Sequence, residues 1–319
     1  MYLLRSRAML AAFSLLVCLV IAEAAGRSIK PDNPKRADGF VTDSKLGWIL
    51  PAGQTMKWRR KTAKINQIGM RGPEPKTNPS TRILMVGDSS MFGDGVQDHE
   101  TMAAQLARLL PSADIQNAGV PGYTCIQTRE WIRRIKSQFK PDIIISYNQH
   151  SDFRKTESHD QVVAAASLGP LAGTGIGHLL TRGILWRRMN AGRSNLTVDE
   201  YTSCLTAMAE SQQKHGGKML YVVPFSEDDF PTSPVFGKPE PEPIGQRLTD
   251  YRQAMCDVAE ATGNACLKAP EAMRSAGLTS ANSLQDMVHP TALGHQQLAK
   301  AIAAQLENTG WLGATRKKR

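Results

Sequence analysis

Four short polar segments of the sequence carry residue types that are used in nucleophilic acyl chemistry. The first is Gly-Asp-Ser at residues 87–89, and the last contains Asp286, which stands three residues before His289. A carboxylate at this spacing can hold the imidazole of the histidine, which can then take a proton from a serine hydroxyl. The two segments together predict a serine nucleophile that a histidine and a carboxylate activate.

The two middle segments could supply hydrogen-bond donors to a reacting oxygen. Residues 117–122 contain Gly119, and glycine allows a backbone N–H group to approach a substrate oxygen closely. Residues 147–152 read Tyr-Asn-Gln-His-Ser-Asp and carry several polar side chains. Each segment alone is typical of an ordinary turn, but the four together are far more specific for catalysis.

The first three segments follow short apolar runs, which are typical of buried parallel strands. Because ligand-binding groups of open parallel sheets gather at the carboxyl ends of the strands, we expect the segments to meet there. Helical patterns alternate with these strands along the chain. The predicted strands cover residues 83–86, 115–117, 142–147, 219–223 and 265–267, and the predicted helices cover residues 100–110, 126–139, 198–215, 246–262 and 291–306.

With these segments in this order, the sequence resembles the SGNH (GDSL-like) hydrolase superfamily over about residues 65–307. The resemblance implies an α/β fold, a flavodoxin-like three-layer α/β/α sandwich with a central parallel five-stranded sheet. It implies that Ser89 is the nucleophile, that His289 is the general base and then the general acid, and that Asp286 orients His289. It also implies that the backbone N–H groups of Ser89 and Gly119 form part of the oxyanion hole.

The sequence departs from the family at the third oxyanion donor. The family has an asparagine in a Gly-x-Asn-Asp block, and that position falls on Ser151 here, followed by the expected Asp152, while the glycine position falls on Gln149. Ser151 would donate through a shorter side chain, and Asn148 is the alternative donor. Because one lost oxyanion donor costs about 3 kcal/mol of transition-state stabilisation, the departure predicts slow, altered or absent activity.

The resemblance and the residues lead to three functional hypotheses. The first is an exported serine esterase or deacetylase, a carboxylic ester hydrolase that cleaves O-acyl (acetyl) esters on a carbohydrate through a Ser89 acyl-enzyme. The second is an O-acetyltransferase that uses the same residues on an extracellular or cell-wall polysaccharide. The third is a catalytically impaired polysaccharide-binding protein. Residues 66–72 are similar to an exported bacterial branch associated with polysaccharide, and a serine triad requires no metal or other cofactor.

The N-terminus predicts export to the periplasm or secretion. Arg5 and Arg7 precede an apolar run at residues 8–22, and small residues follow at an A-x-A-type cleavage site. The run is shorter than the roughly 20 residues that a spanning helix prefers, which favours a cleaved signal peptide at residues 1–25. An uncleaved N-terminal membrane anchor is the alternative.

The rest of the chain is expected to form one domain with additions. We expect an extended lead-in at residues 26–80, a hydrolase domain at residues 81–309 with an insertion or lid at about 152–198, and a basic tail at residues 310–319. The formal net charge of the 319 residues is +10, and much of it lies in these additions. We therefore expect no nucleic-acid partner. The expected partner is an acylated carbohydrate or polysaccharide, and an anionic polysaccharide is one option because basic residues could bind it.

Four cysteines remain if the signal peptide is removed: Cys125, Cys204, Cys256 and Cys266. An even number of cysteines in an oxidising compartment permits disulfides. Cys256 and Cys266 flank a short connection and are the favoured pair, with four buried thiols as the alternative.

Overall fold

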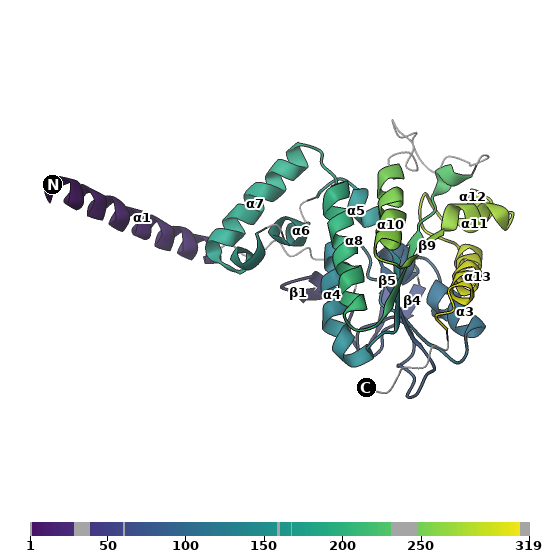
Figure 1. The fold of residues 1–319 in the computed structure, drawn as a ribbon. Coiled ribbons are helices and arrows are strands. Elements are labelled where there is room, and N and C mark those ends of the chain that lie inside the picture. Colours follow the sequence, from purple (N-terminus) through teal and green to yellow (C-terminus); the bar gives the residue numbers. More distant parts are fainter. Residues whose placement is uncertain are drawn as a thin grey trace. The chain divides into compact units, whose positions relative to one another are not determined.

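The computed structural model describes residues 2–28, 39–59, 61–157, 160–166, 168–230 and 248–312. The chain divides into two compact units, of which the larger is formed by Arg36–Arg154 and Leu196–Arg319 and the smaller by Met1–Lys35 and Lys155–Asn195 (Figure 1). Most of the predicted basic tail, residues 313–319, lies outside the described residues.

A parallel five-stranded sheet forms the centre of the larger unit, as predicted. Its order is β6-β5-β7-β8-β9, which is the 2-1-3-4-5 order of flavodoxin-like folds. Strands β5, β7 and β8 are largely apolar, as expected of a sheet that helices cover on both faces. They are β5 (Arg82–Gly87), β6 (Asp114–Asn117), β7 (Ile143–Tyr147), β8 (Lys218–Val223) and β9 (Ala265–Lys268).

Helices form the two outer layers of this unit, so the predicted three-layer α/β/α architecture is confirmed (Figure 1). One layer contains α3 (Met102–Leu109) and α13 (Ala292–Asn308), and the other contains α4 (Cys125–Phe139), α8 (Val198–Gln213) and α10 (Thr249–Ala261). Shorter helices lie in the connections: α2 (Ser89–Phe92), α5 (His150–Phe153), α11 (Ala269–Ser275), α12 (Ser280–Ser283), η1 (Asp98–Glu100) and η3 (Glu227–Asp229).

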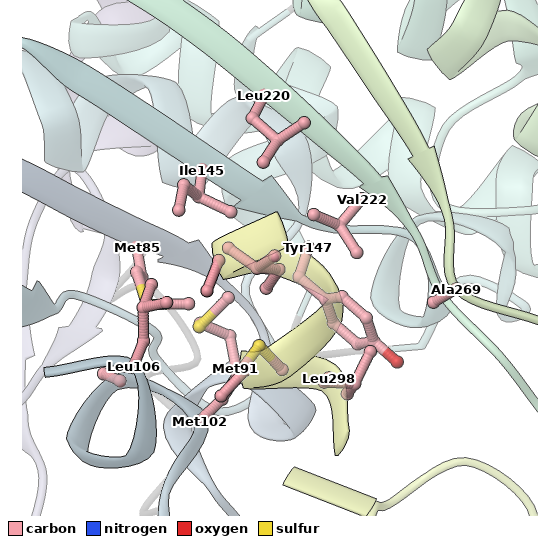
Figure 2. Close-up of a cluster of buried hydrophobic side chains, with 14 of the residues drawn as sticks. Met85, Met91, Met102, Leu106, Ile145, Tyr147, Leu220, Val222, Ala269 and Leu298 are labelled. Carbon is pink, nitrogen blue, oxygen red and sulfur yellow. The ribbon is translucent and has the colours of Figure 1, made fainter. Parts of the chain in front are cut away.

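A hydrophobic core fills the space between the sheet and the layer of α3 and α13 (Figure 2). The strands contribute Met85, Ile145 and Val222, and the helices contribute Leu106 and Leu298, all fully buried. This burial stabilises the carboxyl ends of β5 and β7, from which the polar segments extend.

The segment predicted as an extended lead-in forms two antiparallel hairpins in the larger unit. The first joins β1 (Val41–Asp43) and β2 (Gly47–Ile49), and the second joins β3 (Thr55–Trp58) and β4 (Lys61–Lys64). The indole of Trp48 donates to the carbonyl oxygen of Pro121 at 3.0 Å, which attaches the first hairpin to the loop after β6.

Two disulfides link elements of the larger unit. The favoured pair, Cys256 and Cys266, joins α10 to β9. A second disulfide joins Cys125, the first residue of α4, to Cys204 in α8. It spans 79 residues, and neither periodicity nor local spacing points to it.

The smaller unit is helical. It contains α1 (Tyr2–Ser28), α6 (Gln161–Ala166), η2 (Gly169–Gly173) and α7 (Gly175–Asn190). The last three elements come from the predicted insertion, whose role as a lid stays a prediction.

Candidate active site

The end of β5 places Ser89 at the start of a one-turn helix. Asp88 caps this helix because its Oδ1 atom accepts a hydrogen bond from the Ser90 N–H at 3.1 Å. Gly87 stands where a Cβ atom would collide with the carbonyl group of Tyr147 in the neighbouring strand β7, so this position requires glycine. The local structure therefore turns the chain sharply after the strand and leaves Ser89 partly exposed.

The structure brings Ser89, His289 and Asp286 into one hydrogen-bonded chain. The Nε2 atom of His289 lies 2.8 Å from Ser89 Oγ, although 200 residues separate the two. The Nδ1 atom lies 2.7 Å from Asp286 Oδ2. The backbone N–H of His289 also donates to Asp286 Oδ1 at 2.9 Å, so the carboxylate fixes both the turn and the ring.

The carboxylates around His289 favour the protonated form of its ring, which is the form that arises when the ring takes the serine proton. Burial alone would lower the pKa of His289, but the hydrogen bond and charge of Asp286, with the carboxylates of Asp94 and Asp88, raise that pKa above its usual value. Burial alone would raise the pKa of Asp286, but the hydrogen bond and charge of His289 hold it well below its usual range. Asp286 therefore stays ionised and stabilises an imidazolium.

The predicted oxyanion donor Gly119 is already engaged. Its N–H donates to Asn117 Oδ1 at 3.0 Å, and a Cβ atom at this position would collide with the backbone of Met91 and Phe92. Within the described part of the chain, the backbone N–H groups of Ser89 and Gly122 have no acceptor. Gly122 stands in the same segment as Gly119 but was not among the predicted donors, and its φ of +80° favours glycine.

Neither predicted third donor has a free polar group. The N–H of Ser151 donates to Asp88 Oδ2 at 3.2 Å, and its hydroxyl is hydrogen-bonded to the same carboxyl group. The side-chain amide of Asn148 donates to Thr128 Oγ1 at 2.9 Å, and its oxygen accepts from Ser146 Oγ at 3.2 Å. Asn148 is fully buried, so its amide could reach a substrate only by breaking these bonds.

His150 is the polar residue of this segment that sequence reasoning missed. Both of its ring nitrogens are buried, and neither has a hydrogen-bond partner in the described residues. It is the third residue after the end of β7, and the last residues of β5 and β7, Gly87 and Tyr147, are paired in register. An uncommitted donor therefore lies at the same sheet edge as Ser89.

A cavity of about 430 Å³ opens beside the histidine, and most of its lining residues carry charged or polar side chains. The tip of the β3–β4 hairpin contributes to it, because the Trp58 indole donates to Asp94 Oδ1 at 3.0 Å and Arg59 Nε lies 3.2 Å from Asp94 Oδ2. The same Oδ2 atom lies 3.7 Å from His289 Nε2. The lining residues are Arg59, Lys61, Asp94, Gly95, Gln285, Asp286 and His289.

Arg71 supports the loop that carries Asp94. Its side chain is 2% exposed and donates to the carbonyl oxygens of Gly93 and Val96, both at 2.8 Å, and to that of Phe92 at 3.0 Å. Its Nε atom also lies 2.8 Å from Asp98 Oδ1. The sequence of residues 66–72, which is similar to an exported bacterial branch of the family, suggested no physical role for this segment. The structure shows that its Arg71 holds the loop that carries Asp94.

Comparisons with known proteins agree with this geometry. A model of the GDSL-like Lipase/Acylhydrolase family matches residues 85–297. The structure is similar to LAE5, an alpha/beta hydrolase enzyme from the metagenome of Lake Arreo, Spain, with a TM-score of 0.50 and 18% identity over 74% of this chain and 98% of that chain. It is also similar to Axe2, an acetylxylan esterase from Geobacillus stearothermophilus, with a TM-score of 0.46 and 18% identity over 76% of this chain and 99% of that chain. No similar sequence was found among curated proteins.

Proposed function

We propose that this chain, which belongs to the GDSL-like lipase/acylhydrolase family, is an exported serine esterase that removes O-acyl groups, acetyl above all, from a carbohydrate. Family membership makes the chain a carboxylic ester hydrolase. The observation that carries the proposed mechanism is the hydrogen-bonded chain from Ser89 through His289 to Asp286.

The reaction begins when His289 Nε2 takes the proton of Ser89 Oγ, which attacks the ester carbonyl carbon. We expect the backbone N–H group of Ser89, with that of Gly122 as a second candidate donor, to stabilise the oxyanion of the tetrahedral intermediate. The imidazolium then gives its proton to the departing sugar oxygen, and the acyl group remains on Ser89. Water, deprotonated by His289, attacks this acyl-enzyme and releases the carboxylic acid, with the proton returned to Ser89.

The lining of the cavity supports a polar substrate with a short acyl group. Arg59, Lys61 and Asp94 surround the approach to His289 with charged groups. Such groups hydrogen-bond readily to sugar hydroxyls, whereas a long acyl chain would have to desolvate them. The apolar N-terminal helix supports export.

The first prediction tests the nucleophile. We expect Ser89→Ala in the full chain to lower kcat/KM for p-nitrophenyl acetate and for an acetylated polysaccharide by at least about 10³-fold, because no other group replaces the attacking oxygen. Ser112→Ala, which changes an exposed serine outside the site, should retain the wild-type rate. Equal rates for Ser89→Ala and wild type would contradict the esterase.

The same assay separates hydrolysis from transfer. Sugar acceptors are added to the wild-type reaction, and products are analysed by mass spectrometry. Release of free acid as the main product supports the esterase. If acylated acceptor forms in excess over free acid and its formation needs Ser89, the protein is an acyltransferase instead.

A further inference from the structure

Helix α1 presents an apolar surface that is long enough to cross a bilayer. The stretch Met9–Ser28 has 20 residues with a mean hydropathy of 2.2, and only 6% of it is buried. At 1.5 Å per residue this length matches the roughly 30 Å hydrocarbon core of a membrane. The apolar run in the sequence suggested a shorter segment, but the helix continues past it through Glu23 and Arg27, whose side chains pair at 2.7 Å.

The last turns of α1 are built into the smaller unit. The carboxylate of Glu23 accepts a hydrogen bond from the Ile176 N–H at 3.0 Å, in the first turn of α7. N–H groups at this end of a helix have no partner within the helix, and the helix dipole favours a negative charge there. Gly26 and Gly175 pack backbone against backbone, because a Cβ atom on either would collide with the other helix.

This contact bears on signal cleavage. Removal of residues 1–25 would take away Glu23, the acceptor of the Ile176 N–H group, although Thr174 would still cap α7. It would also remove most of the helix against which α7 packs. These contacts favour a folded unit in which α1 remains attached.

Helix α7 carries a second exposed apolar surface of the kind found at membrane interfaces. Leu179, Trp186 and Met189 are exposed by 38%, 66% and 42%, and they lie on one side of the helix together with Arg182. Trp is enriched where the hydrocarbon core meets the headgroups, and Arg extends its charge toward anionic headgroups. Arg187 adds a further exposed charge.

We propose that the smaller unit attaches this protein to an anionic lipid bilayer, with α1 retained as the spanning anchor and the exposed side of α7 lying among the headgroups. Arg5 and Arg7 precede the span, so the positive-inside rule places them in the cytoplasm and the larger unit outside it. The inference goes beyond ester hydrolysis, and it does not depend on which ester is cleaved.

Retention of α1 is tested by the mass and location of the full chain with a C-terminal tag, expressed in a bacterial host. We expect the intact mass, with residues 1–25 present, in a membrane pellet that resists a carbonate wash. A chain that has lost residues 1–25 and is recovered in the soluble fraction would overturn the anchor.

The position of α7 is tested with an environment-sensitive fluorophore in vesicles that contain phosphatidylglycerol. The full chain carries Cys18→Ser to remove the exposed free thiol, and the fluorophore is attached through Met189→Cys or, as a control on an exposed position of the larger unit, through Lys300→Cys. We expect blue-shifted emission and quenching by brominated lipid for Met189→Cys only. Water-like emission from both labels would overturn the α7 contact. Neither readout uses esterase activity, so failure here is distinct from failure of the proposed function.

Discussion

His289 Nε2 faces two oxygens, Ser89 Oγ at 2.8 Å and Asp94 Oδ2 at 3.7 Å. The second carboxylate is buried and lies against Arg59, so it is held in place rather than free to rotate away. An imidazolium formed during the reaction is thus stabilised by Asp286 on one nitrogen and by Asp94 near the other. Asp94 acts as a positioning and charge-tuning residue.

We expect Asp94→Asn to move the acid limb of the kcat/KM profile to lower pH, by on the order of 1 unit. Asp286, Asp94 and Asp88 raise the pKa of His289, and the neutral ring is the active base. Loss of one carboxylate lowers that pKa, so the base stays neutral at lower pH, and the charge of Arg59, no longer balanced by Asp94, acts in the same direction. The profile is measured from pH 4 to 9, with Asp250→Asn as the exposed control; an unmoved acid limb in Asp94→Asn would contradict this role.

At the scale of elements, the active site depends on segments far apart in the chain. The β3–β4 hairpin contributes Arg59 and Lys61 to the cavity, and Arg59 holds the turn with a φ of +42°. Arg71, which follows the hairpin, donates to three backbone carbonyls of the loop after α2. The two hairpins within the predicted extended lead-in thus belong to the larger unit and contribute to the cavity.

We expect Arg71→Met to lower the free energy of unfolding by about 3 kcal/mol, because three backbone carbonyls each lose one donor and Asp98 loses its arginine partner. The matched control is Arg133→Met, which removes an arginine that is 65% exposed and pairs with Glu130; it should change stability by about 0.5 kcal/mol or less. Urea unfolding under non-reducing conditions measures both. If both variants lost the same free energy of unfolding, Arg71 would not stabilise the loop that carries Asp94.

At the scale of the whole molecule, burial keeps two histidines neutral among the residues that the structure describes. Burial lowers the pKa of His150 and of His295 to about 3, and nearby positive groups act in the same direction. In the unfolded chain both would titrate near 6.5. As pH falls from about 6.5 to about 3 the unfolded state binds protons that the folded state does not, so each histidine removes stability over this range.

We expect His295→Gln to reduce the pH dependence of unfolding between pH 6 and 4 by up to about 1.4 kcal/mol per pH unit. The readout is the difference in slope from wild type, which cancels the carboxyl groups common to both proteins. His99→Gln, at an exposed position, should keep the wild-type slope. An unchanged slope in His295→Gln would show that His295 is protonated in the folded protein.

The sequence by itself determined the sheet and nominated Ser89, His289 and Asp286, which the structure joins by hydrogen bonds. Local apolar runs indicate most of the strands. Because the carboxyl ends of parallel strands lie at one edge of the sheet, Ser89 and the other polar segments are expected at that edge. Asp286 and His289 are separated by three residues, a spacing at which side chains on one turn meet. Both the strands and the Asp286–His289 pair depend on residues that are close together in the chain, so a single sequence is enough to predict them.

Only the tertiary structure decided which polar groups face the reaction. Asn148 and Ser151 are two of the residues that spacing nominates as donors, yet their polar groups bind Thr128 and Asp88, while His150 has no partner among the described residues. The approach of Asp94 to His289 crosses 195 residues of sequence, and the Cys125–Cys204 disulfide crosses 79. Such contacts form only when complete layers of the fold pack together. Burial and shape decide which distant segments meet, and the local periodicity of a sequence does not contain this information.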